Sequence, residues 1–221
     1  MFMPTARARR NTRVESITAM LGRYIDRSRV ELRVCTFSNP GDAAAQLERA
    51  GIPVDHLGTS PRLSNPQAPI ALWKYLREQE PDVLHAAIGE AIFHGALVGK
   101  LAGVPCVIGE EVGIPARSPK AQFIFGVLYH MMDSVVAVAK ATQDYLEQEE
   151  NLSPDKIDLI YNCIDASYFE ASARAPRDDG EKHLLAVGRL VEEKNHITLI
   201  RSMKTVVEAH PGVLLSIAGE G

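Results

Sequence analysis

The last forty residues, 182–221, constrain the fold most strongly, because they carry the pattern of a single β-α-β unit. An apolar run at residues 184–187 stops at Gly188, and apolar positions return at helical spacing between residues 197 and 207. A His-Pro-Gly turn ends that helix. The second run, at residues 213–218, is apolar at nearly every position, which is typical of a parallel strand buried on both faces. This stretch therefore predicts a parallel sheet with a crossover helix.

Both strands of this unit end in glycine, and charged side chains stand beside the glycines. Ligands of open α/β sheets bind outside the carboxyl ends of the strands, so we expect both glycine turns to line one edge. Arginine and lysine suit a diphosphate there, and a Gly-x-Gly segment lets backbone N–H groups approach an anion. The residues concerned are Gly188, Arg189, Lys194, Gly219, Glu220 and Gly221. Spacing alone favours an ordinary solvated surface loop.

The residues before this unit repeat the alternation of strand and helix. An alternation of apolar and polar residues predicts a strand at residues 30–37, and short apolar runs predict strands at residues 52–57, 82–86, 104–108, 134–138 and 157–161. Helical spacing predicts helices at residues 12–25, 42–50, 70–79, 90–102, 121–132 and 141–150. Such alternation implies a doubly wound parallel sheet with helices on both faces, an α/β fold. No strand is expected before Arg13.

A shift in composition separates these two parts of the chain. Residues 170–181 contain no large apolar side chain, which indicates an interdomain linker. We therefore predict a Rossmann-like domain at residues 1–169, the linker, and the start of a second Rossmann-like domain at residues 182–221. The chain stops on a glycine turn after a core strand, so we expect this second domain to be incomplete.

Composition argues against several classes of protein. The formal net charge is −4, so no general basic field attracts nucleic acid. Cys35, Cys106 and Cys163 are isolated in the sequence, which favours a reducing compartment and offers no zinc-binding spacing. The longest apolar segment, residues 91–109, is interrupted by charge, glycine and proline and does not predict a membrane span.

Residues 186–195 resemble the donor-phosphate segment of the family 4 glycosyltransferases of the GT-B fold, in which a Gly-Arg-Leu turn and a lysine open the nucleotide-sugar domain. The helix that follows and the Ile-Ala-Gly-Glu-Gly segment at residues 217–221 stand in the same order. Residues 81–85, 102–105, 132–142 and 157–165 are similar to segments of the family's first domain. The resemblance covers residues 13–221, and the joint order of these motifs is far more specific than any one of them.

The resemblance implies transfer of a sugar from a nucleotide-sugar donor to a hydroxyl group of a glycan or lipid-linked acceptor, with retention at the anomeric carbon. It implies glycan or polysaccharide biosynthesis in the cytoplasm, and it leaves contact with the inner face of the membrane open. Arg189 and Lys194 would neutralise the leaving diphosphate, and neither a cofactor nor a metal is implied. The sequence does not indicate an oligomeric state.

Three departures from the family pattern affect the expected site. The family's first strand and glycine loop have no expected counterpart before Arg13, and its paired donor-binding glutamates would lie beyond Gly221. Where many members carry a histidine, this chain has Glu110 and Glu111. The candidate catalytic residues are Glu111 and His85, and the candidate hinge or cleft residue is Asn162. Solvated loop charges, a structural histidine and an ordinary turn asparagine would explain the same residues without a ligand.

Because these parts of the family pattern are not found, we expect the 221 residues alone not to transfer sugar. Two alternatives stay open. One is a related GT-B enzyme that acts on nucleotide-sugars, such as an epimerase, which a product assay without acceptor would detect. The other is a non-catalytic fragment or binding module that has kept the fold without turnover.

Overall fold

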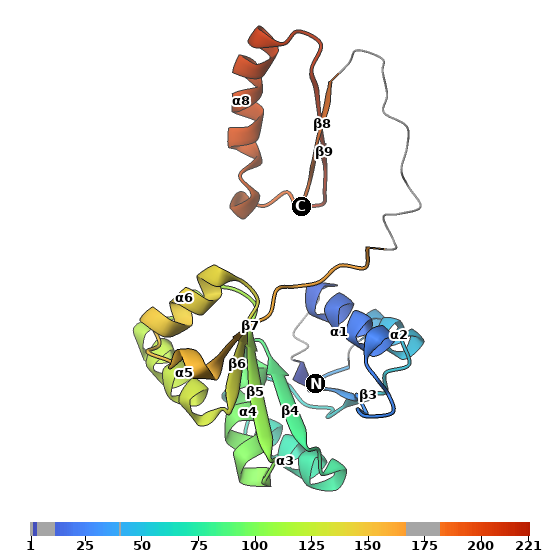
Figure 1. The fold of residues 1–221 in the computed structure, drawn as a ribbon, viewed down its shortest axis with the longest axis vertical. Coiled ribbons are helices and arrows are strands. Elements are labelled where there is room, and N and C mark those ends of the chain that lie inside the picture. Colours follow the sequence, from blue (N-terminus) through green and yellow to red (C-terminus); the bar gives the residue numbers. More distant parts are fainter. Residues whose placement is uncertain (1, 4–11, 40, 167–181) are drawn as a thin grey trace. The chain divides into compact units, whose positions relative to one another are not determined.

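In a computed structural model of the chain, residues 2–3, 12–39, 41–166 and 182–221 are described. The chain divides into two compact units, Met1–Asp165 and Ala166–Gly221 (Figure 1). The predicted linker, residues 170–181, lies outside the described residues, so its boundaries stay a prediction. No described helix is long and apolar enough to cross a bilayer.

Among the described residues, the first unit contains a parallel sheet of seven strands in the order β3-β2-β1-β4-β5-β6-β7. The strands are β1 (Phe2–Met3), β2 (Val34–Thr36), β3 (Val54–His56), β4 (Val83–Ala87), β5 (Cys106–Glu111), β6 (Ser134–Ala137) and β7 (Ile157–Leu159). The chain runs outward from β1 to β3 and then returns to β4 on the other side of β1. The strand order therefore reverses between β1 and β4, where sheets of this kind bind ligands.

Helices cover both faces of this sheet. They are α1 (Thr12–Tyr24), α2 (Asp42–Arg49), α3 (Gln67–Gln79), α4 (Gly89–Ala102), α5 (Pro119–Met131) and α6 (Lys140–Gln148). α1 packs on α2, whereas α4 packs between α3 and α5. Alternate residues of β4 place these two groups on opposite faces, because Ala86 lies against Gly95 of α4 while Ala87 clusters with Ala19 of α1 and Leu47 of α2. The doubly wound arrangement is the one that the alternating pattern predicts.

Glycine allows α4 to lie close to the sheet. A Cβ atom on Gly95 would stand 2.8 Å from Cβ of Ala86, and one on Gly99 would stand 2.8 Å from Cδ2 of Leu84. Real Cβ atoms do not approach that closely, so a larger residue at either position would push the helix away. The larger core cluster lies on this face and includes Leu72, Ile92, Val107, Leu128 and Val135.

One strand of the first unit was not expected from the sequence. β1 (Phe2–Met3) pairs with Cys35 and Thr36 of β2 on one side and with Ala86 of β4 on the other. The expectation that no strand precedes Arg13, and that the first strand of this domain is missing, is therefore wrong. The reason is physical, because two residues are too few to show an apolar run or an alternation.

The end of β5 also differs from the prediction. We expected the strand to stop at Ile108 and a loop to begin at Gly109, but β5 continues to Glu111. Glu110 and Glu111 are buried, with 6% and 5% of their surface exposed, so they are not solvated loop charges. Two adjacent carboxylates in a sequence usually indicate a segment that is exposed to solvent. Here both side chains are buried, because they contact residues that lie far from them in the sequence.

The second unit is the β-α-β arrangement that its apolar pattern predicts. β8 (His183–Val187) pairs in parallel with β9 (Leu214–Ala218), and α8 (His196–Ala209) connects them. A short 3₁₀ turn, Glu192–Lys194, precedes the helix. These two strands form a sheet of their own, separate from the sheet of the first unit.

Candidate functional site

A cavity opens at the carboxyl edge of the first unit's sheet, on the side of β2, β3 and β4, and we call it the polar cavity because most of the residues that line it have polar side chains. Its volume is about 910 Å³. The lining residues are Ser38, Asn39, His56, Gly58, Thr59, Ser60, Pro61, Arg62, Ser64, Asn65, Pro66 and Glu90. A neighbouring cavity of about 520 Å³ shares Arg62, Ser64 and Glu90 and adds the Phe125 ring. Hydroxyl and amide groups with one cation and one carboxylate suit a polyhydroxylated ligand.

The loop that walls this cavity is fixed by side-chain hydrogen bonds. Asn65 Nδ2 donates to Thr59 Oγ1 and to the carbonyl of Ser60, both at 2.9 Å. His94 on α4 donates a hydrogen bond from Nε2 to the carbonyl of Pro61 at 3.1 Å, which places the proton on Nε2. His94 is buried, and this burial lowers its pKa from the usual 6.5. The sequence showed this stretch only as a proline-rich loop, since no pattern links residue 94 to residue 61.

We expect the first unit to lose stability as the pH falls from about 7 to about 5. The unfolded chain takes up a proton on His94 near pH 6.5, whereas the folded chain resists it, so the unfolded state binds more protons over this range. The loss reaches about 1.4 kcal/mol per pH unit for one such proton. Urea unfolding followed by the fluorescence of Trp73 measures it. In His94→Gln, which can still donate to Pro61 but does not titrate, the decline should be shallower, and an equal decline would contradict the assignment.

Glu111, a candidate catalytic residue, lies in a buried network at the end of β5. Its Oε2 accepts hydrogen bonds from Tyr129 Oη at 2.5 Å and from Arg117 Nη2 at 2.8 Å. Arg117 Nη1 also donates to Tyr129 Oη at 2.7 Å, and its guanidinium lies 3.6 Å from the centre of the Phe125 ring. Burial raises the pKa of Glu111, although Tyr129 and Arg117 act in the opposite direction. The network joins the loop after β5 to α5 and supports the wall of the neighbouring cavity, which Phe125 lines.

His85, the second candidate, lies on the opposite face of the sheet from Glu111. Its Nε2 stands 2.9 Å from Glu110 Oε2, within ion-pair distance, but the pair lacks hydrogen-bond geometry, and Nε2 has no hydrogen-bond partner among the described residues. His85 also lines a cavity of about 630 Å³ on the α1 side, together with Leu21 and Ile108. The structure therefore brings His85 to Glu110 and does not bring it to Glu111.

Asn162 follows β7 in an exposed, irregular segment. A few residues further on, Asp165 forms an ion pair with Arg23 at 3.2 Å, which fastens this segment to the last turn of α1. Among the described residues, no cluster of three or more His, Cys, Asp or Glu side chains could hold a metal ion.

In the second unit, the two glycine turns lie at one edge, as predicted. Gly188 N donates to the carbonyl of Ala218 at 3.0 Å, and Leu190 N donates to that of Glu220 at 2.8 Å, so pairing continues beyond both strands. A Cβ atom on Gly219 would stand 1.8 Å from the carbonyl oxygen of Gly188. Only glycine fits there, because the obstacle is backbone and cannot move aside.

Arg189 and Lys194 are exposed beside this edge. Arg189 has 61% of its side chain exposed, and its Nη2 lies 3.5 Å from Glu193 Oε2, itself 81% exposed. An ion pair so open to water is weak, so the guanidinium can turn toward an anion at little cost. His196 Nε2 donates to the carbonyl of Arg189 at 2.9 Å and closes the loop. We did not predict His196, and a polar residue at the start of a helix gives no signal of such a contact.

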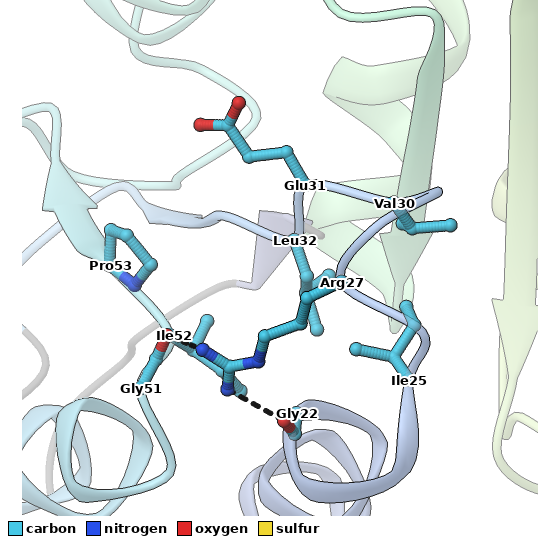
Figure 2. Close-up of a pocket in the computed structure, with 9 residues that line it drawn as sticks. All are labelled: Gly22, Ile25, Arg27, Val30, Glu31, Leu32, Gly51, Ile52 and Pro53. Carbon is cyan, nitrogen blue, oxygen red and sulfur yellow. Dashed lines mark hydrogen bonds between the residues drawn. The ribbon is translucent and has the colours of Figure 1, made fainter.

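A fourth cavity, of about 290 Å³, lies between the carboxyl ends of α1 and α2 (Figure 2). Arg27 donates to the carbonyls of Gly22 at 2.7 Å, Ala50 at 2.6 Å and Gly51 at 3.1 Å. The carbonyls of Gly22 and Ala50 lie at the carboxyl ends of α1 and α2, where the negative ends of the helix dipoles lie, and Gly51 follows directly after α2. The guanidinium therefore has a structural role, and this cavity is not a candidate site.

Arg27→Met should lower the free energy of unfolding by about 1–2 kcal/mol, because methionine keeps the apolar stem but leaves three carbonyls without a charged donor. Urea unfolding, again followed by Trp73, measures the change. Arg29→Met is the matched control, since Arg29 is exposed two residues away. Equal effects of the two substitutions would show that the carbonyl contacts contribute nothing.

Residues 14–168 match the family described as Glycosyltransferase Family 4, which is more than half of the chain. The chain belongs to this family. Glycogen synthase of Mycobacterium tuberculosis is 29% identical over 182 residues, covering 78% of this chain and 40% of that protein. The UDP-Gal:alpha-D-GlcNAc-diphosphoundecaprenol alpha-1,3-galactosyltransferase of Escherichia coli is 27% identical over 171 residues, covering 69% and 44%. This family 4 chain thus spans less than half the length of these two relatives.

Solved structures agree with this family assignment at the level of the fold. A glycosyltransferase from Rickettsia africae matches with a TM-score of 0.70 at 12% identity, covering 98% of this chain and 67% of that one. HepE of Anabaena in complex with UDP matches with a TM-score of 0.67 at 15% identity, covering 98% and 68%. The predicted fold class, GT-B with Rossmann-like parallel sheets, is confirmed for this family 4 member.

Proposed function

We propose that the protein transfers a sugar from a nucleotide-sugar to a hydroxyl group of a glycan or lipid-linked acceptor, with retention at the anomeric carbon, in glycan or polysaccharide assembly. The observation that carries this proposal is the edge of the second unit, where two exposed cations flank a turn that only glycine fits. Arg189 and Lys194 would neutralise the charge that develops on the leaving diphosphate, so the reaction would need no metal or cofactor. A UDP complex of HepE supports a nucleotide donor.

The polar cavity of the first unit is the proposed acceptor side. Its hydroxyl and amide lining suits a saccharide, and the name of the Escherichia coli relative supports one carried on a lipid diphosphate. Such an acceptor would place the protein in the cytoplasm at the inner face of the membrane. Glu111 and His85 stay predictions as catalytic residues, and Asn162 stays a prediction as a hinge residue. The contacts of Glu111 support a role in holding the wall of the neighbouring cavity.

A product assay tests the proposal and separates it from its alternatives. The 221-residue chain, and any longer product of the same gene, is incubated with radiolabelled nucleotide-sugars, with and without glycan or lipid-linked acceptors. Label on the acceptor supports transfer. Conversion of the nucleotide-sugar without acceptor would instead indicate an epimerase. Binding of nucleoside diphosphate with neither product would indicate a binding module.

A further inference from the structure

The outer surface of α3, α4 and α5 carries several large apolar side chains that are exposed to solvent. On α5, Phe123 is 75% exposed and Val127 48%, and on α4 Leu101 is 77% exposed. We call this surface the outer helical face. Its large apolar residues are Ile70, Trp73, Leu97, Leu101, Phe123, Ile124, Val127 and Met131. α4 contacts both α3 and α5, so the three helices lie side by side on this face of the sheet.

Basic residues are interspersed with these apolar ones. Lys74 and Arg77 follow Trp73 on the exposed side of α3, and Lys120 lies one turn before Phe123 and Ile124 on α5. α5 contains no acidic residue at all. The acidic residues of these helices are Glu78, which is exposed beside Arg77 at the end of α3, and Glu90 at the start of α4.

We propose that the outer helical face docks on an anionic lipid surface. Helices that lie in the plane of a membrane combine Lys and Arg with Trp, Phe and Leu in this way, and each basic residue near anionic headgroups adds attraction. A second copy of the chain is a poorer partner, because a self-complementary contact would bring like basic charges together. The proposal extends the proposed function by naming the surface that meets the membrane. Its test is separate, because vesicle binding requires neither donor nor acceptor.

Trp73 makes the test direct, because it is the only tryptophan in the sequence and lies on this face. The chain is mixed with vesicles of phosphatidylcholine alone or with added phosphatidylglycerol. We expect co-sedimentation with the anionic vesicles, a shift of Trp73 emission to shorter wavelength, and quenching by lipids brominated in their acyl chains. Absence of binding, or binding without any change at Trp73, would overturn the proposal.

Three variants refine the test. Phe123→Ser should weaken vesicle binding about tenfold or more, and Lys120→Gln about fivefold and only with anionic vesicles. Tyr24→Ser is the matched control, because Tyr24 is 70% exposed on α1, on the opposite face of the sheet, and its loss should change nothing. Circular dichroism verifies that each variant is folded. A vesicle-independent dimer that Phe123→Ser dissociates would show that a second copy, and not lipid, occupies the face.

Discussion

Arg117→Met should lower the free energy of unfolding of the first unit by about 3–5 kcal/mol, the largest stability effect that we expect in this chain. The substitution leaves the Glu111 carboxylate, whose side chain is 6% exposed, without the cation that lies 2.8 Å away. It also removes a donor to Tyr129 Oη and the contact with the Phe125 ring. Removing one partner of a buried pair is costly because the remaining charge stays desolvated.

The pH dependence of Arg117→Met separates this charge effect from lost packing. Burial already raises the pKa of Glu111 in the folded state, and loss of Arg117 should raise it further. The unfavourable charge is present above the unfolded pKa, near 4.5, and is relieved as falling pH protonates the folded carboxyl group. The penalty should therefore be larger at about pH 8 than at about pH 5. The double variant Glu111→Gln with Arg117→Met should recover part of the loss, and a pH-independent penalty would assign it to packing.

Arg189→Ala and Lys194→Ala should each weaken nucleoside diphosphate binding about tenfold to a hundredfold and, in a longer product of the gene that transfers sugar, should lower kcat/KM for the donor by the same factor. Each loses a charge-assisted contact of about 1.5–3 kcal/mol. Titration calorimetry with a panel of nucleoside diphosphates measures binding, and the transfer assay measures kcat/KM. Lys194→Arg should also be poor, because a guanidinium fork does not reproduce a point charge at a fixed position.

Arg201→Ala on α8 is the control for these two variants, since Arg201 is exposed on the helix that follows the turn. It should leave affinity unchanged. Glu193→Gln should leave affinity unchanged or raise it, because it removes the carboxylate nearest Arg189. If the two cation variants bind diphosphates as well as the unsubstituted chain does, Arg189 and Lys194 belong to an ordinary solvated loop.

The sequence predicted the parts of the molecule that follow a local period. Strands β4 to β7, the helices around them and the β-α-β unit of the second part all have apolar runs or helical spacing that one can read directly. The same is true of the shared edge of Gly188 and Gly219, which follows from the parallel pairing of two strands.

What the sequence did not reveal depends on contacts between distant residues. Glu110 and Glu111 read as loop charges because their partners, His85 in one case and Arg117 with Tyr129 in the other, are identified only by the fold. The loop that walls the polar cavity could not be predicted for the same reason. His94 lies on α4, another element, and holds this loop by a hydrogen bond to the carbonyl of Pro61. The apolar pattern of a sequence predicts which face of a helix or strand a side chain lies on, but not which distant residue that side chain contacts.

The short strand β1 has a consequence for how the first unit assembles. Phe2 pairs with Ala86, which is 84 positions later (86 − 2), so the sheet closes only after β4 has formed. In the described fold β1 stands between two half-sheets, β2 with β3 and β4 with β5 to β7, and main-chain bonds from two residues form the seam between them. The polar cavity straddles this seam, with Ser38 and His56 from one half-sheet and Glu90 following the other. A shift of one half-sheet against the other would therefore change the shape of the cavity.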